Sequence, residues 1–135
     1  MAENIKFEVV TPEKEVVSEQ AQIVMAPGSM GEFGVLAGHT PFMTSLKTGI
    51  VHYRDENGKD KYVFVSGGFA EALPDKITIL AESAELGSDI DLARAESAKE
   101  RAERRLAEKK AGVDFERAHS ALQRAIVRIS IAGMQ

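Results

Sequence analysis

Residues 84–95 read AELGSDIDLARA, and the character of the chain changes within this stretch. All four prolines lie before residue 75, and eight of the eleven glycines lie before residue 69. After residue 86 there is no proline, and alanine, arginine and glutamate dominate. Because glycine and proline separate short strands whereas the later composition favours helices, we predict two units, residues 1–86 and residues 87–135.

The first unit carries short segments that are rich in β-branched and aromatic residues. We predict strands at residues 5–10, 22–26, 49–54, 61–66 and 76–81. Asn57-Gly58 favours a tight hairpin turn between two of them, because glycine and asparagine tolerate positive φ. The glycine-rich residues 28–38 lack the lysine and the following helix of a phosphate loop, so they predict a turn-and-bulge segment.

The second unit shows the spacing of two helices. Ser88 and Asp91 fit a capping box before a helix that runs to about Lys110, and Asp114 fits the cap of a second helix after Ala111-Gly112. A thin stripe of small residues marks the first helix: Ala95, Ala98, Ala102 and Leu106. A stronger apolar face marks the second: Phe115, Ala118, Leu122, Ala125, Ile126 and Ile129. The short link favours an antiparallel pairing, which small side chains would hold only loosely.

The fold class that follows is α+β. We predict an N-terminal antiparallel β-sandwich, or flattened barrel, followed by a C-terminal antiparallel two-helix hairpin. No apolar run approaches the ~18–20 residues of a transmembrane helix, and the N-terminus does not resemble a signal peptide. The chain has no cysteine, and its three histidines are scattered, so we predict no metal site and no catalytic residues.

The arginines carry the sharper signal. Seven of the eight lie in residues 87–135, where ten basic residues exceed eight acidic ones. Two sets repeat the spacing i, i+7, i+11: Arg94, Arg101 and Arg105, then Arg117, Arg124 and Arg128. Each set lies along one helix face. The face is either solvated and tied by pairs such as Glu100–Arg104, or its guanidinium groups converge on a nucleotide phosphate, an acidic protein segment or nucleic acid.

Three stretches resemble the ε subunits of bacterial F-type ATP synthases. The first is GEFGVLAGHTP at residues 31–41, the second is SGGFAE at residues 66–71 with DKITILA at residues 75–81, and the third is IDLARA at residues 90–95. They occur in the family's order and span both units. Phe33 and Ala37 depart from the family's leucine and proline, but Glu32 and the flanking glycines are retained.

This resemblance implies a place at the foot of the rotating central stalk. The sandwich of this family binds the γ subunit and the c-ring, and the resemblance implies that Glu32, with His39 near it in sequence, makes those contacts. In this family the hairpin permits ATP hydrolysis when it is folded on the sandwich. The resemblance implies that it inhibits hydrolysis when it extends along γ, with basic residues facing the α/β head. The resemblance further implies a peripheral membrane protein at the cytoplasmic face of the bacterial plasma membrane.

Some members of this family bind ATP in the folded state. Their ligand contacts correspond to Glu85, Ile90, Asp91, Arg94, Ala95, Arg101, Arg124 and Arg128. The resemblance therefore implies ATP as a regulatory ligand and no required cofactor, and it leaves the part played by Mg²⁺ open.

Two other classes compete with this interpretation. A free-standing nucleic-acid-binding module could use the arginine-rich hairpin, but the net charge is −4 and no aromatic residues stand among the arginines for base stacking. A small enzyme built on the sandwich would need a nucleophile beside a base, and no such group is evident. We therefore expect γ, the c-ring, the α and β subunits and ATP as partners, and no nucleic acid.

Overall fold

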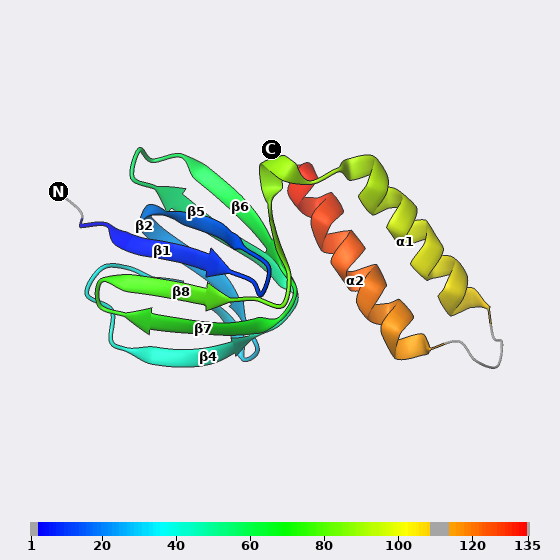
Figure 1. Cartoon of the computed structure of the whole chain (residues 1–135), viewed down its shortest axis with the longest axis horizontal. Coiled ribbons are helices and arrows are strands. Elements are labelled where there is room, and N and C mark those ends of the chain that lie inside the picture. The colour runs from blue at the N-terminus through cyan, green and yellow to red at the C-terminus, as the bar shows by residue number, and fades with distance from the viewer. Residues whose placement is uncertain (1–2, 109–113, 135) are drawn as a thin grey trace.

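A computed structural model of the chain describes residues 3–108 and 114–134, and it places a β-sandwich beside a two-helix hairpin (Figure 1). The described residues form nine strands: β1 (Ile5–Val10), β2 (Glu15–Gly28), β3 (Gly31–Val35), β4 (Phe42–Leu46), β5 (Gly49–Asp55), β6 (Asp60–Val65), β7 (Gly68–Leu73), β8 (Lys76–Leu80) and β9 (Ala84–Leu86). A short 3-10 turn, η1 (Gly87–Asp89), leads into α1 (Leu92–Ala107) and α2 (Phe115–Ala132). The predicted α+β fold is confirmed.

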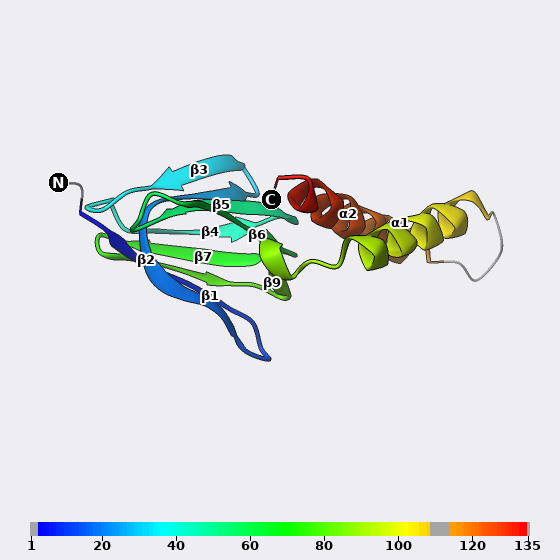
Figure 2. The ribbon, with the colours of Figure 1, turned by 90° about the horizontal axis from the view of Figure 1, so that it is seen from above.

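Strand β2 joins the two layers of the sandwich. Its first half pairs with β1, its second half pairs with β3 and β5, and Gly28 at its end pairs with Leu46 of β4. The order β1-β8-β7-β4 leads back to β2, so the strands close into a flattened barrel, which Figure 2 shows from above. Among the described strands, β1 and β8 form the one parallel pair, an exception to the predicted antiparallel pattern.

The core lies between the two layers. Alternate residues of each strand point inward, and the rings of Phe7 on β1 and Tyr53 on β5 meet there with centroids 4.7 Å apart. Isoleucine, valine and alanine side chains fill the remaining space, and many of them are fully buried. The sandwich therefore contains most of the apolar contact in the molecule.

The strands differ from the sequence prediction in two places. The segment predicted at residues 22–26 is the middle of the much longer β2, and the glycine-rich segment contains a regular strand, β3. Gly68, within the SGGFAE motif, has φ +114°, and a Cβ there would overlap the carbonyl oxygen of Leu80. That backbone approach requires glycine, so this part of the motif serves strand packing.

The start of α1 corrects the predicted capping box. Asp91, and not Ser88, is the N-cap: its side chain accepts a hydrogen bond from the Arg94 N–H at 3.1 Å. Ser88 lies in η1, because the chain makes a 3-10 turn before the helix begins. Helix α1 ends at Ala107, earlier than the predicted end near Lys110, because the backbone of Glu108 is extended. Lys110 and the predicted stop at Ala111-Gly112 lie outside the described residues. The Asp114 cap of α2 is confirmed, with Arg117 N–H donating at 3.0 Å.

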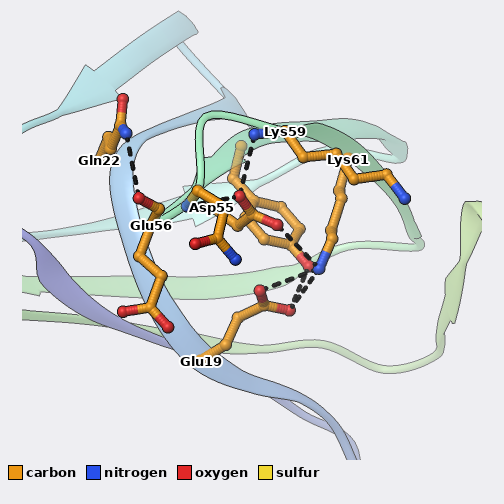
Figure 3. Close-up of polar contacts among 8 residues, drawn as sticks. Glu19, Gln22, Asp55, Glu56, Lys59 and Lys61 are labelled. Atoms are coloured by element: carbon orange, nitrogen blue, oxygen red, sulfur yellow. Dashed lines mark hydrogen bonds and ion pairs between the residues drawn. The ribbon is translucent and has the colours of Figure 1, made fainter.

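A polar network secures the β5–β6 hairpin against β2 (Figure 3). Lys61 Nζ lies 3.0 Å from Glu19 Oε1 and 3.2 Å from Asp55 Oδ2. Asp55 is buried, and its Oδ1 accepts the N–H groups of Asn57 and Lys59, both at 2.9 Å. The Lys59 N–H above all, together with Lys61 and Asn57, lowers the pKa of Asp55 against the opposing effect of desolvation.

Replacing Asp55 tests this network. Because its pKa is lowered in the folded chain, the carboxylate stabilises the fold above its unfolded pKa of ~3.9, and the contribution is lost as pH falls through the folded value. We expect Asp55→Asn to lower the thermal midpoint at pH 7 by several degrees and the difference from the parent chain to shrink below pH ~4. Glu56→Gln, an exposed change in the same turn, serves as the control. A pH-independent difference would mean that charge at Asp55 is not the cause.

Candidate functional site

Helices α1 and α2 pack against each other through alanines. The buried residues of α1 are Ala95 and Ala102, and those of α2 are Ala118, Ala125 and, near its C-terminal end, Ile131. Alanine removes little apolar surface from water, so at ~25 cal/mol per Å² this seam contributes little free energy. The burial of these alanines agrees with the small-residue stripe and the apolar face predicted from the sequence.

A groove of about 590 Å³ runs between the two helices. Five arginines line it: Arg101 and Arg105 from α1, and Arg117, Arg124 and Arg128 from α2. Glu108 and Asp114 line it as well, and they stand at the facing ends of the two helices. The two arginine stripes therefore converge on a common space, apart from Arg94, which is exposed and does not line the groove.

The groove carries an excess of positive charge. Within residues 3–108 and 114–134, Arg128 is the one groove arginine with an ion-pair partner closer than 4 Å, and the Glu100–Arg104 pair of the solvated-face interpretation is not formed. Guanidinium groups that share a confined space repel one another, and an anion that accepts their forked hydrogen bonds relieves this. The arrangement favours binding of an anion with several oxygens.

Arg128 links the groove to the sandwich. Its Nε lies 3.1 Å from Glu85 Oε1, and its guanidinium carbon lies 4.1 Å from the centre of the Phe64 ring. Sequence reasoning placed Glu85 and Arg128 in one site but missed Phe64. The run Tyr62-Val63-Phe64-Val65 is apolar without a break, and such a run indicates a strand covered on both faces.

The other residues of the predicted ATP site lie near the start of α1, outside the lining of the groove. Ile90 is half-buried after η1, Asp91 is the helix cap, and Ala95 is buried in the alanine seam. The structure thus gathers Arg101, Arg124 and Arg128 in the groove, with Glu85 attached through Arg128. Asp91 and Ala95 have structural roles, Asp91 as the N-cap of α1 and Ala95 as a buried residue of the alanine seam.

Glu32 and His39 lie at opposite ends of β3. Glu32 is exposed beside the β2–β3 turn and is opposite Pro27 in the strand pairing. His39 follows the strand, in a loop where Gly38 N–H bonds to the Pro74 carbonyl, and its ring lies 4.9 Å from that of Phe42. The contacts that the structure gives for His39 do not include Glu32.

Two apolar surfaces remain uncovered. On the outer face of β4, β7 and β8, Met43, Phe69 and Leu80 are each more than half exposed, and an apolar groove lies beside Phe69 and Leu80. On α2, Phe115 and Ile126 are each 46% exposed, so part of the predicted apolar face lies in water. Exposed apolar surfaces commonly mark protein interaction sites.

The described residues contain no group of three histidine, aspartate or glutamate side chains that could hold a metal ion. Neither of the helices that the structure describes has the length and apolar character needed to cross a membrane.

The sequence matches two family models in succession. Residues 4–87 match the family described as ATP synthase, Delta/Epsilon chain, beta-sandwich domain, and residues 88–133 match ATP synthase, Delta/Epsilon chain, long alpha-helix domain. The ATP synthase epsilon chain of Desulforapulum autotrophicum is 61% identical over 131 residues, which cover 97% of each chain. The ATP synthase epsilon chain of Syntrophobacter fumaroxidans is 54% identical over 132 residues, which cover 98% of each chain.

Solved structures agree with the fold. A chain in the cryo-EM structure of Euglena gracilis mitochondrial ATP synthase, OSCP/F1/c-ring in rotational state 1, is 25% identical, with a TM-score of 0.80 over 98% of this chain and 82% of that chain. A chain in the central stalk/c-ring structure of Tetrahymena thermophila mitochondrial ATP synthase is 12% identical, with a TM-score of 0.55 over 98% of this chain and 96% of that one. The second likeness concerns the fold alone.

The capping role of Asp91 can be tested by substitution. Asp91→Ala removes the acceptor of the Arg94 N–H and is expected to destabilise α1 by about 1 kcal/mol, whereas Asp91→Ser preserves the cap. We expect a reduced helical circular dichroism signal, with an earlier thermal loss, for the alanine variant only. Asp89→Ala, in η1, is the control. Equal losses from Asp89→Ala and Asp91→Ala would contradict the capping role.

Proposed function

The chain belongs to the ATP synthase delta/epsilon chain family, and we propose that it serves as the epsilon subunit in the central stalk of a bacterial F-type ATP synthase. Relatives more than half identical over nearly the whole chain support this assignment. The subunit contributes to ATP synthesis and proton transport as part of the complex and performs no catalysis itself. Family membership favours this function over a free-standing nucleic-acid-binding module.

The sandwich is the part that joins the rotor. We assign the exposed apolar face with Met43, Phe69 and Leu80 to the γ subunit, because an apolar surface of this kind needs a protein partner. Glu32, exposed beside the β2–β3 turn, is assigned to the polar loops of the c-ring, and His39 remains a predicted contact of the same interface. The location that follows is peripheral to the membrane, at the cytoplasmic face of the bacterial plasma membrane.

The hairpin is the regulatory part. Folded beside the sandwich it permits hydrolysis, and extended along γ it inhibits, with its arginines facing the α/β head. Two observations support a hairpin with two resting positions. The alanine seam binds α1 to α2 weakly, and Phe115 and Ile126 on α2 are uncovered in the folded form. In the extended form these side chains would find apolar partners that they lack here.

The arginine groove is the observation that most supports regulation by ATP. The triphosphate carries several negative charges, and its oxygens suit guanidinium groups contributed by both helices. A ligand that binds only the folded hairpin stabilises it by RT ln(1 + [L]/Kd), which is ~2.7 kcal/mol at a hundredfold excess over Kd. That amount is large enough to shift the position of a weakly held hairpin. ATP is then a regulatory ligand rather than a cofactor.

Calorimetric titration of the full chain with ATP tests the groove. We expect saturable one-to-one binding, measured with and without Mg²⁺ at physiological salt. Arg101→Ala combined with Arg124→Ala removes one groove arginine from each helix. Because each charge-assisted hydrogen bond contributes ~1.5–3 kcal/mol, we expect the affinity to fall by roughly a hundredfold or more.

Arg104→Ala is the matched control, since Arg104 lies on α1 between groove residues but does not line the groove. An unchanged affinity in the double variant, or an equal loss in the control, would remove the groove as the ATP site. The rotor assignment would stand in either case.

The apolar face is tested by assembly. Met43→Ser together with Phe69→Ser is expected to reduce copurification with γ several-fold, while the isolated chain keeps its thermal midpoint because both side chains are exposed. Met30→Ser provides the comparison, because Met30 is 97% exposed but belongs to the β2–β3 turn rather than to β4, β7 or β8. A greater loss from Met30→Ser than from the pair would place the γ contact at that turn.

A further inference from the structure

Phe64 is buried although it points out of the sandwich. It has no exposed surface, yet it does not belong to the sandwich core that contains its neighbours Val63 and Val65. Because successive side chains of a strand alternate between faces, Phe64 lies on the outer face of β6. Helix α2 packs on β5, β6 and η1, and it brings Arg128 over the Phe64 ring. The burial of Phe64 therefore depends on the docked hairpin.

Glu85 stands next to Phe64 on the same face. The two residues are opposite each other in the β6–β9 ladder, so their side chains project together. Phe64 meets the guanidinium of Arg128 at 4.1 Å, and Glu85 accepts from its Nε at 3.1 Å. One pair of strand residues thus holds a single arginine by two contacts of different kinds, a cation–π contact and a charge-assisted hydrogen bond.

The same arginine lines the groove between α1 and α2. The Nε–H group of Arg128 donates to Glu85, and the two other nitrogens of the guanidinium carry N–H groups that can donate to an anion. An arginine fixed in this way loses less side-chain freedom when a ligand binds. Undocking the hairpin would release Arg128, expose Phe64 and leave the groove with a mobile side chain at that position.

We propose that Phe64 and Glu85 are positioning residues that hold the Arg128 guanidinium in the groove, so that hairpin docking and anion binding share this one side chain. The proposal rests on the proposed function and deepens it, because it names the contact that couples the two events. It assigns Glu85 an effect through Arg128 rather than direct contact with ATP. Coupling of this kind is reciprocal: ligand binding favours docking by the same factor as docking favours ligand binding.

The test uses the full chain, with ATP as the probe and two readouts. The first is ATP affinity by calorimetry. The second is the distance between labels on Lys59→Cys in the β5–β6 turn and Glu103→Cys on α1, which are specific because the chain has no native cysteine. Phe64→Leu removes the ring but stays apolar, and Glu85→Gln removes only the charge. Tyr62→Leu is the control, because Tyr62 lies on β6 and stacks on His52 rather than on Arg128.

We expect Phe64→Leu and Glu85→Gln each to weaken ATP binding on the order of tenfold and to enlarge the undocked population. Added ATP should restore docking, and Tyr62→Leu should change neither readout. In an Arg128→Ala background both substitutions should cause no further loss, since they act through Arg128. A loss that persists in that background, or unchanged affinity and label distance in both variants, overturns the proposal.

Two outcomes separate this proposal from the ATP site. If the parent chain binds no ATP, the proposed ATP site fails and the coupling to it fails as well. The label distance then decides the docking role alone: release of the hairpin by Glu85→Gln supports the Arg128 anchor, and no release overturns it. Should Phe64→Leu lower the stability of the sandwich in urea, Glu85→Gln carries the test by itself.

Discussion

Alanine side chains form the buried contact between the two helices of the hairpin, and the limited apolar area of that contact governs how the C-terminal unit behaves. Ala95, Ala102, Ala118 and Ala125 are buried but small, so the helices come close without removing much surface from water. The sandwich is different, because aromatic and branched side chains such as Phe7 and Tyr53 fill the space between its layers. A small change in free energy can therefore move the hairpin without disturbing the sandwich.

The positive charges beside the alanine seam oppose the packing of α1 against α2 that its apolar contact favours. Five arginines line one groove, and their repulsion opposes closure of the two helices when nothing lies between them. An anion reverses the sign of this contribution, because the groups that repel one another then share an attractive partner. A hairpin with a large leucine core would be insensitive to this balance. The sensitivity arises because weak packing and a concentrated charge occur at the same place.

The sequence predicted the elements well because their signals are local. The Asn57-Gly58 turn joins β5 and β6 as predicted, with a positive φ at Gly58 but not at Asn57. The repeated spacing of arginines placed most of them in one groove. The parallel pairing of β1 with β8 was not predictable in this way, because it joins segments about 70 residues apart in sequence. The spacing also did not predict that Arg94 stays out of the groove lining, since spacing assigns a side chain to a helix face but not to the part of that face the neighbouring helix reaches.

The contacts of Arg128 explain why arginine, rather than lysine, suits this position. A flat guanidinium can lie over the Phe64 ring, donate from Nε to Glu85 and still direct N–H groups elsewhere. A lysine ammonium is a single, strongly hydrated point of charge, and it would have to give up one of these partners to keep another. The partners of Arg128 come from both units of the chain. The Phe64 ring and the Glu85 carboxylate belong to the sandwich, and the groove that Arg128 lines belongs to the hairpin. A side chain that can make all three contacts at once connects both units and the ligand, which is the property that a ligand-sensitive contact between two domains requires.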